Sequence, residues 1–209
     1  MLAVLLFLGT WQVERLAWKR GLLAAIAQAE QRPPVPLAGT PAMFTRVRAQ
    51  GRFAAASGLY GAEVREVAGG TVGGAHLLGV LLRDGAPAVL VDRGWVPVPP
   101  PPIQDGPAII DGYLRPPAKP GLFTPDDDLA GRRFYTLDPA AIGAALGTPG
   151  LAPYVLVAMG PPPPPGQPDP ARTMPRPTNN HLSYALTWYG LAAALAVIFV
   201  LHARKVLRP

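Results

Sequence analysis

The sequence predicts a membrane protein of mixed α+β class, in which an N-terminal and a C-terminal transmembrane helix flank a β-rich extracytoplasmic domain with small helices. Three features lead to this prediction. An apolar helical segment opens the chain, an uncharged apolar run lies near its end, and short β-branched stretches bounded by glycine and proline fill the middle. The predicted parts are 1–31 (first transmembrane helix and its extramembrane continuation), 32–172 (β-rich domain), 173–180 (connector), 181–202 (second transmembrane helix) and 203–209 (basic cytoplasmic tail).

The first segment is apolar over residues 1–10, but ten residues are too few to cross a hydrocarbon core of about 30 Å. A basic stretch, which a signal peptide requires, does not precede it. We interpret it as the end of a truncated first span and expect the natural start to lie upstream of Met1. The helical pattern continues to about Gln31, where Pro33 and Pro34 end it.

Two tryptophans in this helix are spaced for a membrane interface. Trp11 and Trp18 are seven residues apart and Arg15 lies between them, so the three side chains share one helix face. Aromatic rings with a cation beside them are typical of the interfacial belt of a membrane helix. The helix therefore leaves the membrane near these residues.

The middle of the chain predicts β-strands and one short helix. Two apolar runs within residues 75–97 flank Asp84-Gly85, a dipeptide favoured in tight hairpin turns. A short helix is expected after Asp138, a good N-cap with Pro139 behind it, and it ends near Gly147. Further strands are expected at residues 46–53, 58–67, 108–116 and 153–158.

Several segments of the domain are expected to be connectors. Residues 68–78, "AGGTVGGAHLL", lack the spacing of a phosphate-binding loop and predict a flexible loop. Pro99–Pro102 and Pro161–Pro165 favour polyproline II, and the second tract is a stiff spacer toward the membrane. Asp126–Asp128 lack the alternating spacing of a calcium loop and predict a solvated turn.

The second span is the clearest membrane signal. Residues 182–201 are uncharged, and twenty residues at 1.5 Å each match the hydrocarbon thickness. Arg204, Lys205 and Arg208 follow, and the bias of basic residues toward the cytoplasm places the C-terminus inside. His181 then lies at the outer surface.

Charge and composition exclude several functional classes. The net charge of +6 comes mostly from the membrane flanks, because residues 31–172 carry twelve basic and eleven acidic side chains. A nucleic-acid-binding domain would need a basic stripe, so this class is set aside. Without cysteine the chain cannot be a thiol copper chaperone or a disulfide oxidoreductase. His76 and His202 lack partners at metal-ligand spacing, and no catalytic constellation is evident, so we expect no enzyme.

Three blocks of the sequence resemble a known family. "GTWQVERLAWK" (Gly9–Lys19), "VLVDRGWVP" (Val89–Pro97) and "NNHLSYALTWYGLA" (Asn179–Ala192) are similar to the signature blocks of the Surfeit locus protein one family, cytochrome c oxidase assembly factors of bacteria and mitochondria. The resemblance implies two spans, both termini cytoplasmic, and a β-rich domain outside the bacterial inner membrane. The family's first span normally runs a full membrane width before the first block, and here only eight residues precede it.

The resemblance also implies a cofactor, because some bacterial members bind haem a. His181 matches the candidate ligand of the third block, and a histidine in the first turn of a helix is favoured in its neutral, iron-binding form. Tyr184 and Trp188 share its helix face and could flank a porphyrin. The alternative is that these polar aromatic residues are ordinary interfacial anchors and that Asn179 and Asn180 only cap the helix.

The first two blocks supply candidates for partner contact, namely Trp11, Gln12, Arg15, Arg93, Gly94 and Trp95. Arg93 and Trp95 are two residues apart, which predicts one strand face for both side chains. They could contact the oxidase subunit or a haem donor. The alternative is a core tryptophan with an arginine stacked on it.

Two functions from different classes follow. In the first, the protein binds haem a transiently and without a covalent bond, since no Cys-x-x-Cys-His is present, and passes it from the haem a synthase to the haem-containing subunit of cytochrome c oxidase. In the second, it is a cofactor-free scaffold that stabilises an oxidase assembly intermediate. Membrane lipid is a partner in both.

Overall fold

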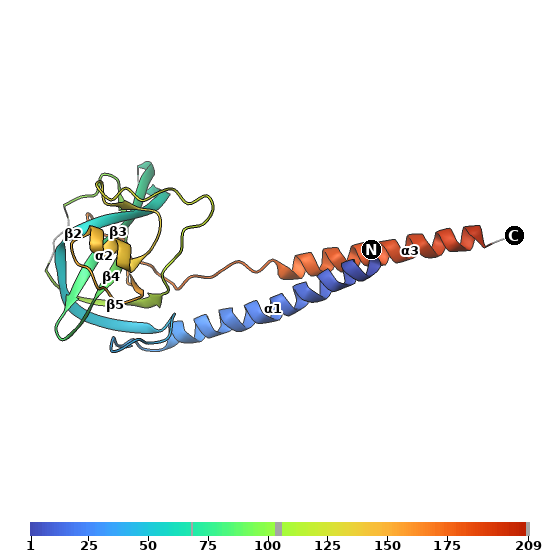
Figure 1. Ribbon diagram of the computed structural model, residues 1–209, viewed down its shortest axis with the longest axis horizontal. Helices are drawn as coiled ribbons and strands as arrows, with labels where there is room; N and C mark the ends of the chain where they lie inside the picture. The colour runs from blue at the N-terminus through green and yellow to red at the C-terminus, as the bar shows by residue number, and fades with distance from the viewer. Residues whose placement is uncertain (68, 103–105, 208–209) are drawn as a thin grey trace. The chain divides into compact units, whose positions relative to one another are not determined.

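The computed structural model describes residues 1–67, 69–102 and 106–207. The chain forms two compact units, one made of Met1–Gln28 with Pro175–Pro209 and the other of Ala29–Met174. The second unit contains a mixed sheet and a short helix, and the first contains two long helices. The structure is therefore of α+β class, as predicted (Figure 1).

The sheet closes on itself. Its long strands run in the order β2-β3-β4-β7-β5, and β2 also pairs with β5. Most pairs are antiparallel, but β4 and β7 are parallel, as are the pairs that β2 makes with the two-residue strands β1 and β6. The strands are β1 Val35–Pro36, β2 Arg46–Val67, β3 Gly70–Arg83, β4 Ala86–Pro97, β5 Pro107–Arg115, β6 Arg133–Phe134 and β7 Val155–Ala158.

Strand β2 joins two strands that the sequence predicts separately. The residues between Phe53 and Ser57 stay in the strand as a register shift against β3, and a second shift lies between Tyr60 and Glu63. Bulges of this kind bend a strand and increase its twist. The bends let one strand pair with β5 along its first half and with β3 along its second.

The predicted hairpin is confirmed, while the predicted glycine loop is wrong. Arg83 pairs with Ala86 across the two-residue turn, in which Gly85 has φ +66°. Gly70 to Gly74 belong to β3 and pair with β2, and Ala68 lies outside the described residues. A Cβ on Gly74 would overlap the Trp95 indole, so glycine makes room there for a neighbouring strand's side chain.

Two apolar cores lie on opposite faces of the sheet. The inner core takes side chains from all five long strands, including Phe53, Leu81, Val91, Leu114 and Leu156. The outer core packs the sheet against α2, the helix Pro139–Ala145, which covers one side of the sheet (Figure 1). Asp138 caps α2 by accepting from the Ala140 N–H at 2.9 Å, which confirms the predicted short helix.

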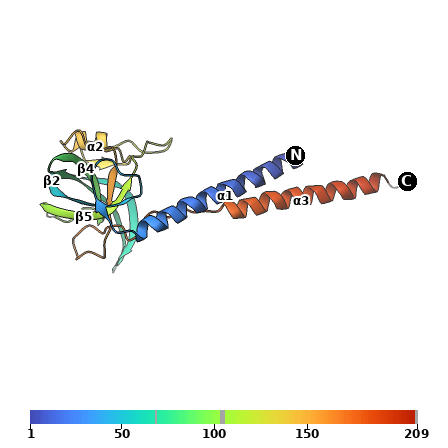
Figure 2. The same ribbon diagram turned by 90° about the horizontal axis from the view of Figure 1, so that it is seen from below.

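The two long helices are α1, Leu2–Gln31, and α3, His181–Val206. They run antiparallel to each other in both views (Figures 1 and 2). Among the described residues, α3 is long and apolar enough to cross a membrane, and α1 does not meet that test. Two membrane spans therefore remain a prediction. Helix α3 extends four residues past its predicted end, and Arg208 lies outside the described residues.

Candidate functional site

Helices α1 and α3 meet through residues of the first and third sequence blocks. A Cβ on Gly9 would lie 2.8 Å from the Tyr189 ring, so glycine permits this close approach. The Thr10 hydroxyl lies 3.0 Å from the Tyr189 hydroxyl. Because Thr10 donates to the Leu6 carbonyl, it accepts the hydrogen bond from Tyr189. Tyr189 is not among the predicted site residues, because Thr10 and Tyr189 are 179 residues apart and a contact at that separation has no local signal in the sequence.

The same helix pair holds His181. Its Nδ1 lies 2.7 Å from Oε1 of Gln12, and Gln12 is buried. An amide oxygen accepts hydrogen bonds and never donates them, so Nδ1 carries the proton. In the neutral ring this leaves the lone pair on Nε2, which is the atom that would coordinate a metal.

The other residues predicted for this site lie on the same two helices and differ in exposure. Tyr184 is 56% exposed on α3, and Trp188 is half-buried. On α1, Trp11 is 47% exposed, and the Arg15 guanidinium stacks on Trp18 at 4.1 Å, in agreement with their predicted shared face.

The helix start differs from the prediction. Asn180 occupies the N-cap of α3 but makes no side-chain capping hydrogen bond. The Oδ1 atom of Asn179 is buried and without a partner among the described residues.

The second block lies within β4, where a bulge separates its side chains. Asp92 pairs with Leu78 and Gly94 pairs with Leu77, so Arg93 is the extra residue of the strand. The prediction that Arg93 and Trp95 share a face is therefore wrong. Arg93 stacks on Phe53 of the inner core at 4.1 Å, whereas Trp95 contacts Gly74 on the other face.

Trp95 is a core residue, 7% exposed, and its indole N–H donates to the Glu63 carbonyl at 3.2 Å. The arginine near its ring is Arg65, at 5.2 Å, and not Arg93. Burial of this kind agrees with the core alternative. It leaves Arg93 as the more accessible side chain of the pair.

Residues 160–174, called the returning segment below, pack against β4 and explain why position 94 is a glycine. Trp95 and Asp169 exchange two backbone hydrogen bonds, of 2.9 and 2.8 Å. Gly94 has φ +114°, and a Cβ there would overlap the Asp169 carbonyl. The second block is therefore the strand segment against which residues 160–174 pack.

A charged network surrounds His76 on the same face. Its Nδ1 lies 2.9 Å from the buried Asp92 carboxylate and its Nε2 lies 3.1 Å from Glu63. The hydrogen bond to Asp92 raises the pKa of His76, with Glu63 adding to the effect against the opposing cost of burial. Both ring nitrogens of His76 are thus hydrogen-bonded to carboxylates.

The network continues from Glu63 to the returning segment. Arg65 pairs with Glu63 at 2.7 Å and with Asp169 at 2.9 Å, and Asp169 also pairs with Arg172. The hydrogen bond from Arg65 lowers the pKa of Glu63. These residues tie β2 to residues 160–174. Sequence reasoning missed the network because its members are scattered along the chain.

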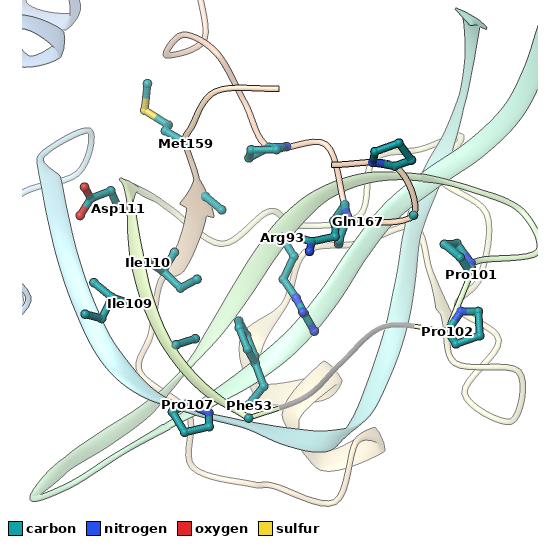
Figure 3. Close-up of a pocket in the computed structure, with 17 residues that line it drawn as sticks. Phe53, Arg93, Pro101, Pro102, Pro107, Ile109, Ile110, Asp111, Met159 and Gln167 are labelled. Carbon is teal, nitrogen blue, oxygen red and sulfur yellow. The ribbon is translucent and has the colours of Figure 1, made fainter. Parts of the chain in front are cut away.

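A cavity of about 730 Å³ lies beside Arg93. Figure 3 shows the Arg93 side chain pointing toward Phe53, with Ile110 of β5 and Gln167 of the returning segment among the lining residues. The lining combines apolar side chains with the Arg93 guanidinium, the Asp111 carboxylate and the Gln167 amide. Within the described part of the chain, no group of three or more His, Asp or Glu residues could hold a metal ion.

Comparison with known proteins identifies the family. A sequence model described as the SURF1 family matches residues 1–193. Surfeit locus protein 1 of Mus musculus is 29% identical over 216 residues, which cover 92% of this chain and 70% of the mouse protein. Surfeit locus protein 1 of Homo sapiens is 29% identical over 217 residues, covering 92% and 71%. A SURF1-like protein of Rickettsia bellii is 27% identical over 220 residues, covering 97% and 88%.

The matched region includes all three sequence blocks, since it runs from α1 through the sheet into α3. The chain belongs to the SURF1 family, whose members are known as cytochrome c oxidase assembly factors.

Proposed function

We propose that this protein assists assembly of cytochrome c oxidase by binding haem a transiently at His181 and presenting it to the haem-containing subunit. The observation that carries the proposal is the 2.7 Å hydrogen bond between His181 Nδ1 and Gln12 Oε1. Histidines that ligate metals usually donate their other ring N–H to an oxygen, which orients the ring and raises its basicity. Gln12 makes that second bond here.

The residues present fit a weakly held haem. A neutral imidazole offers Nε2 to iron, and Tyr184 and Trp188 on the same helix face would pack beside the macrocycle. Bound haem would supply an iron for His181 to coordinate. Coordination by a single histidine of this chain would suit a cofactor that is passed on rather than kept.

The proposed location is the bacterial inner membrane. Helix α3 is apolar enough to span it, and the basic residues Arg204 and Lys205 in its last turn favour a cytoplasmic C-terminus. In the proposal α1 supplies the second span, both termini are cytoplasmic and the sheet lies outside. The haem a synthase is the proposed donor of the cofactor.

One observation favours a second function, that of a cofactor-free scaffold. The His181 and Tyr189 contacts with α1 join two helices regardless of any ligand. A histidine used in this way would anchor the helix pair, and the β domain would supply the contact with the oxidase intermediate.

The test is the visible absorption spectrum of the detergent-purified protein from cells that make haem a. His181→Ala removes the proposed ligand, and His202→Ala, an exposed histidine of the same helix, is the matched control. We expect a haem a spectrum in the wild type and in His202→Ala, and its loss in His181→Ala. If none of the three carries haem while the wild type still restores oxidase assembly, the scaffold function is correct.

A further inference from the structure

A six-residue connector, residues 175–180, joins the end of the returning segment to His181. It reads Pro-Arg-Pro-Thr-Asn-Asn and forms neither helix nor strand. The residues on both sides of it are hydrogen-bonded to α1. The Met174 N–H donates to Oε1 of Glu30 at 2.8 Å, and His181 is bonded to Gln12 at 2.7 Å. The connector and the part of α1 between Gln12 and Glu30 therefore form the two sides of a closed loop.

The two sides of this loop have nearly the same length. Gln12 and Glu30 are 18 residues apart in α1, which at 1.5 Å per residue is about 27 Å. Met174 and His181 are seven residues apart, and a fully extended chain covers at most about 23 to 25 Å in seven residues. Side chains bridge the difference of a few ångströms. The connector must therefore be almost fully extended for both hydrogen bonds to form.

The prolines of the connector favour this extended state. Pro175 and Pro177 each fix their own φ near −65° and disfavour helical backbone in the residue before them. A polyproline II chain rises about 3.1 Å per residue, or about 22 Å over seven residues. The connector therefore comes close to the required length without being stretched from a coil.

The Met174 end of the connector is held more firmly than the His181 end. Met174 is only 1% exposed, and Arg46 of β2 donates to the carbonyls of Glu30 and Arg32 at 3.0 and 3.2 Å. These contacts fix both Met174 and the last turn of α1. The start of α3, in contrast, has no side-chain capping hydrogen bond. A change in the length of the connector should therefore move His181 rather than Met174.

We propose that residues 175–180 form a taut tether, anchored by Met174 and Glu30, whose length places His181 against Gln12. The tether positions the histidine through its length and stiffness rather than through its side chains. Its effect on haem binding rests on the proposed function, whereas the placement of His181 does not.

The first experiment measures the position of residue 181 without haem. The chain has no cysteine, so Gln12→Cys with His181→Cys introduces a single thiol pair, which a short thiol-reactive reagent can cross-link in the detergent-purified protein. Deletion of the exposed Thr178 shortens the tether by about 3.3 Å, and we expect most of the cross-linking to be lost. Insertion of one glycine after Thr178 adds slack, and we expect cross-linking to remain. The matched control, deletion of Pro162, shortens the chain before its anchors and should have no effect.

A second variant keeps the number of residues and changes only the stiffness. Pro175→Gly with Pro177→Gly makes the tether flexible, and a flexible chain of seven residues has ends about 15 Å apart on average. Because the tether must then be stretched, we expect slower cross-linking. Pro161→Gly with Pro162→Gly is the matched control. This variant decides the question if the deletion variant cannot be purified.

Two results would overturn the tether. The first is cross-linking that stays at the wild-type rate after both the Thr178 deletion and the double glycine substitution. The second is equal loss of cross-linking after deletion and insertion, because the residue types of the connector rather than its length would then matter.

Haem titration of the same connector variants, with Gln12 and His181 restored, separates this inference from the proposed function. Loss of the Gln12 contact should weaken haem binding about 10- to 100-fold in the Thr178 deletion. If the wild type binds no haem, the haem-binding function fails, and cross-linking still decides whether the tether exists. If the deletion abolishes cross-linking but leaves the haem affinity unchanged, the tether is supported and His181 held by Gln12 is not the haem ligand.

Discussion

At the scale of single residues, the partner of each histidine decides what its ring can do. His181 faces an amide oxygen, which accepts one ring proton and leaves the other nitrogen for a ligand. His76 faces a carboxylate at each nitrogen, and only the imidazolium form can donate to both. One histidine is therefore arranged for coordination and the other for charge pairing.

Replacing Gln12 tests the first arrangement. Gln12→Leu removes the acceptor that orients His181, and loss of a hydrogen-bond partner behind a metal-binding histidine typically weakens metal binding about 10- to 100-fold. We expect a haem dissociation constant raised by about that factor in an absorbance titration of the detergent-purified protein. Val13→Leu, at the exposed neighbouring position, should leave it unchanged. An unaltered constant in Gln12→Leu would remove Gln12 from the site.

The pairing of His76 makes the stability of the domain depend on pH. Its pKa is raised in the folded state, mainly by Asp92, so the stabilisation is complete below the ordinary value of 6.5 and is lost as pH rises through the folded pKa. The pKa of Glu63 is lowered in the folded state. The stabilisation that its carboxylate contributes is therefore present above the ordinary value of 4.5 and is lost as pH falls through the folded pKa.

His76→Gln should therefore cost the most between about pH 5 and 6.5, by about 1 to 3 kcal/mol, and less at alkaline pH. Thermal unfolding midpoints of the wild type and the variant across pH 5 to 9 measure the difference. His202→Gln is the control. A gap between wild type and His76→Gln that stays constant with pH would show that the ring is not paired as an imidazolium.

At the scale of elements, the β4 bulge and the returning segment depend on each other. The extra residue at Arg93 turns its side chain into the inner face, and the following glycine takes φ +114° beneath the Asp169 carbonyl. A β-bulge can re-aim a side chain in this way. The second sequence block therefore contains both the residue that forms the bulge and the glycine that makes room for the returning segment.

Two glycines allow this to be tested. Gly94→Ala imposes backbone strain and a clash with Asp169, and we expect it to lower the free energy of unfolding by about 2 to 4 kcal/mol. Gly85→Ala, with φ +66° and open space around it, carries the strain alone and should cost about 1 kcal/mol. Denaturant titrations compare them, and equal costs would mean that the close approach of residues 160–174 contributes nothing.

At the scale of the whole molecule, both apolar cores lie within residues 29–174, while two of the three family blocks lie in the helix pair. The sheet has no open edge between β2 and β5, because those strands pair with each other. The β domain thus contains the interactions that fold it.

We therefore expect residues 29–174, expressed alone, to fold cooperatively. Circular dichroism and a single denaturant transition would show it, and the pH dependence caused by His76 should match that of the full-length protein. The comparison is with Leu81→Ala in the same fragment, where truncation of a fully buried side chain should cost about 2 to 5 kcal/mol. A fragment that unfolds without cooperativity would show that the helices are needed to complete the fold.

Much of the fold follows from residues that lie close together in the chain. Periodicity and local chemistry predicted the apolar helix α3, the end of α1 at Gln31, the turn at Gly85 and the capped helix after Asp138, since each depends on residues close together in the chain. Three blocks of residues were enough to identify the family.

The remaining features depend on contacts between residues that are far apart in the chain. Gln12 and His181 are 169 residues apart. Trp95 and Asp169 are joined by backbone hydrogen bonds, which the residue types at these positions do not predict. The glycines within residues 70–74 suggest a loop in the sequence but belong to a strand. Position 74 needs a glycine because the Trp95 indole occupies the space that a side chain would fill. Contacts between distant segments set the bulge, the closed sheet and the partners of both histidines, because pairing and packing depend on which surfaces meet rather than on local residue type.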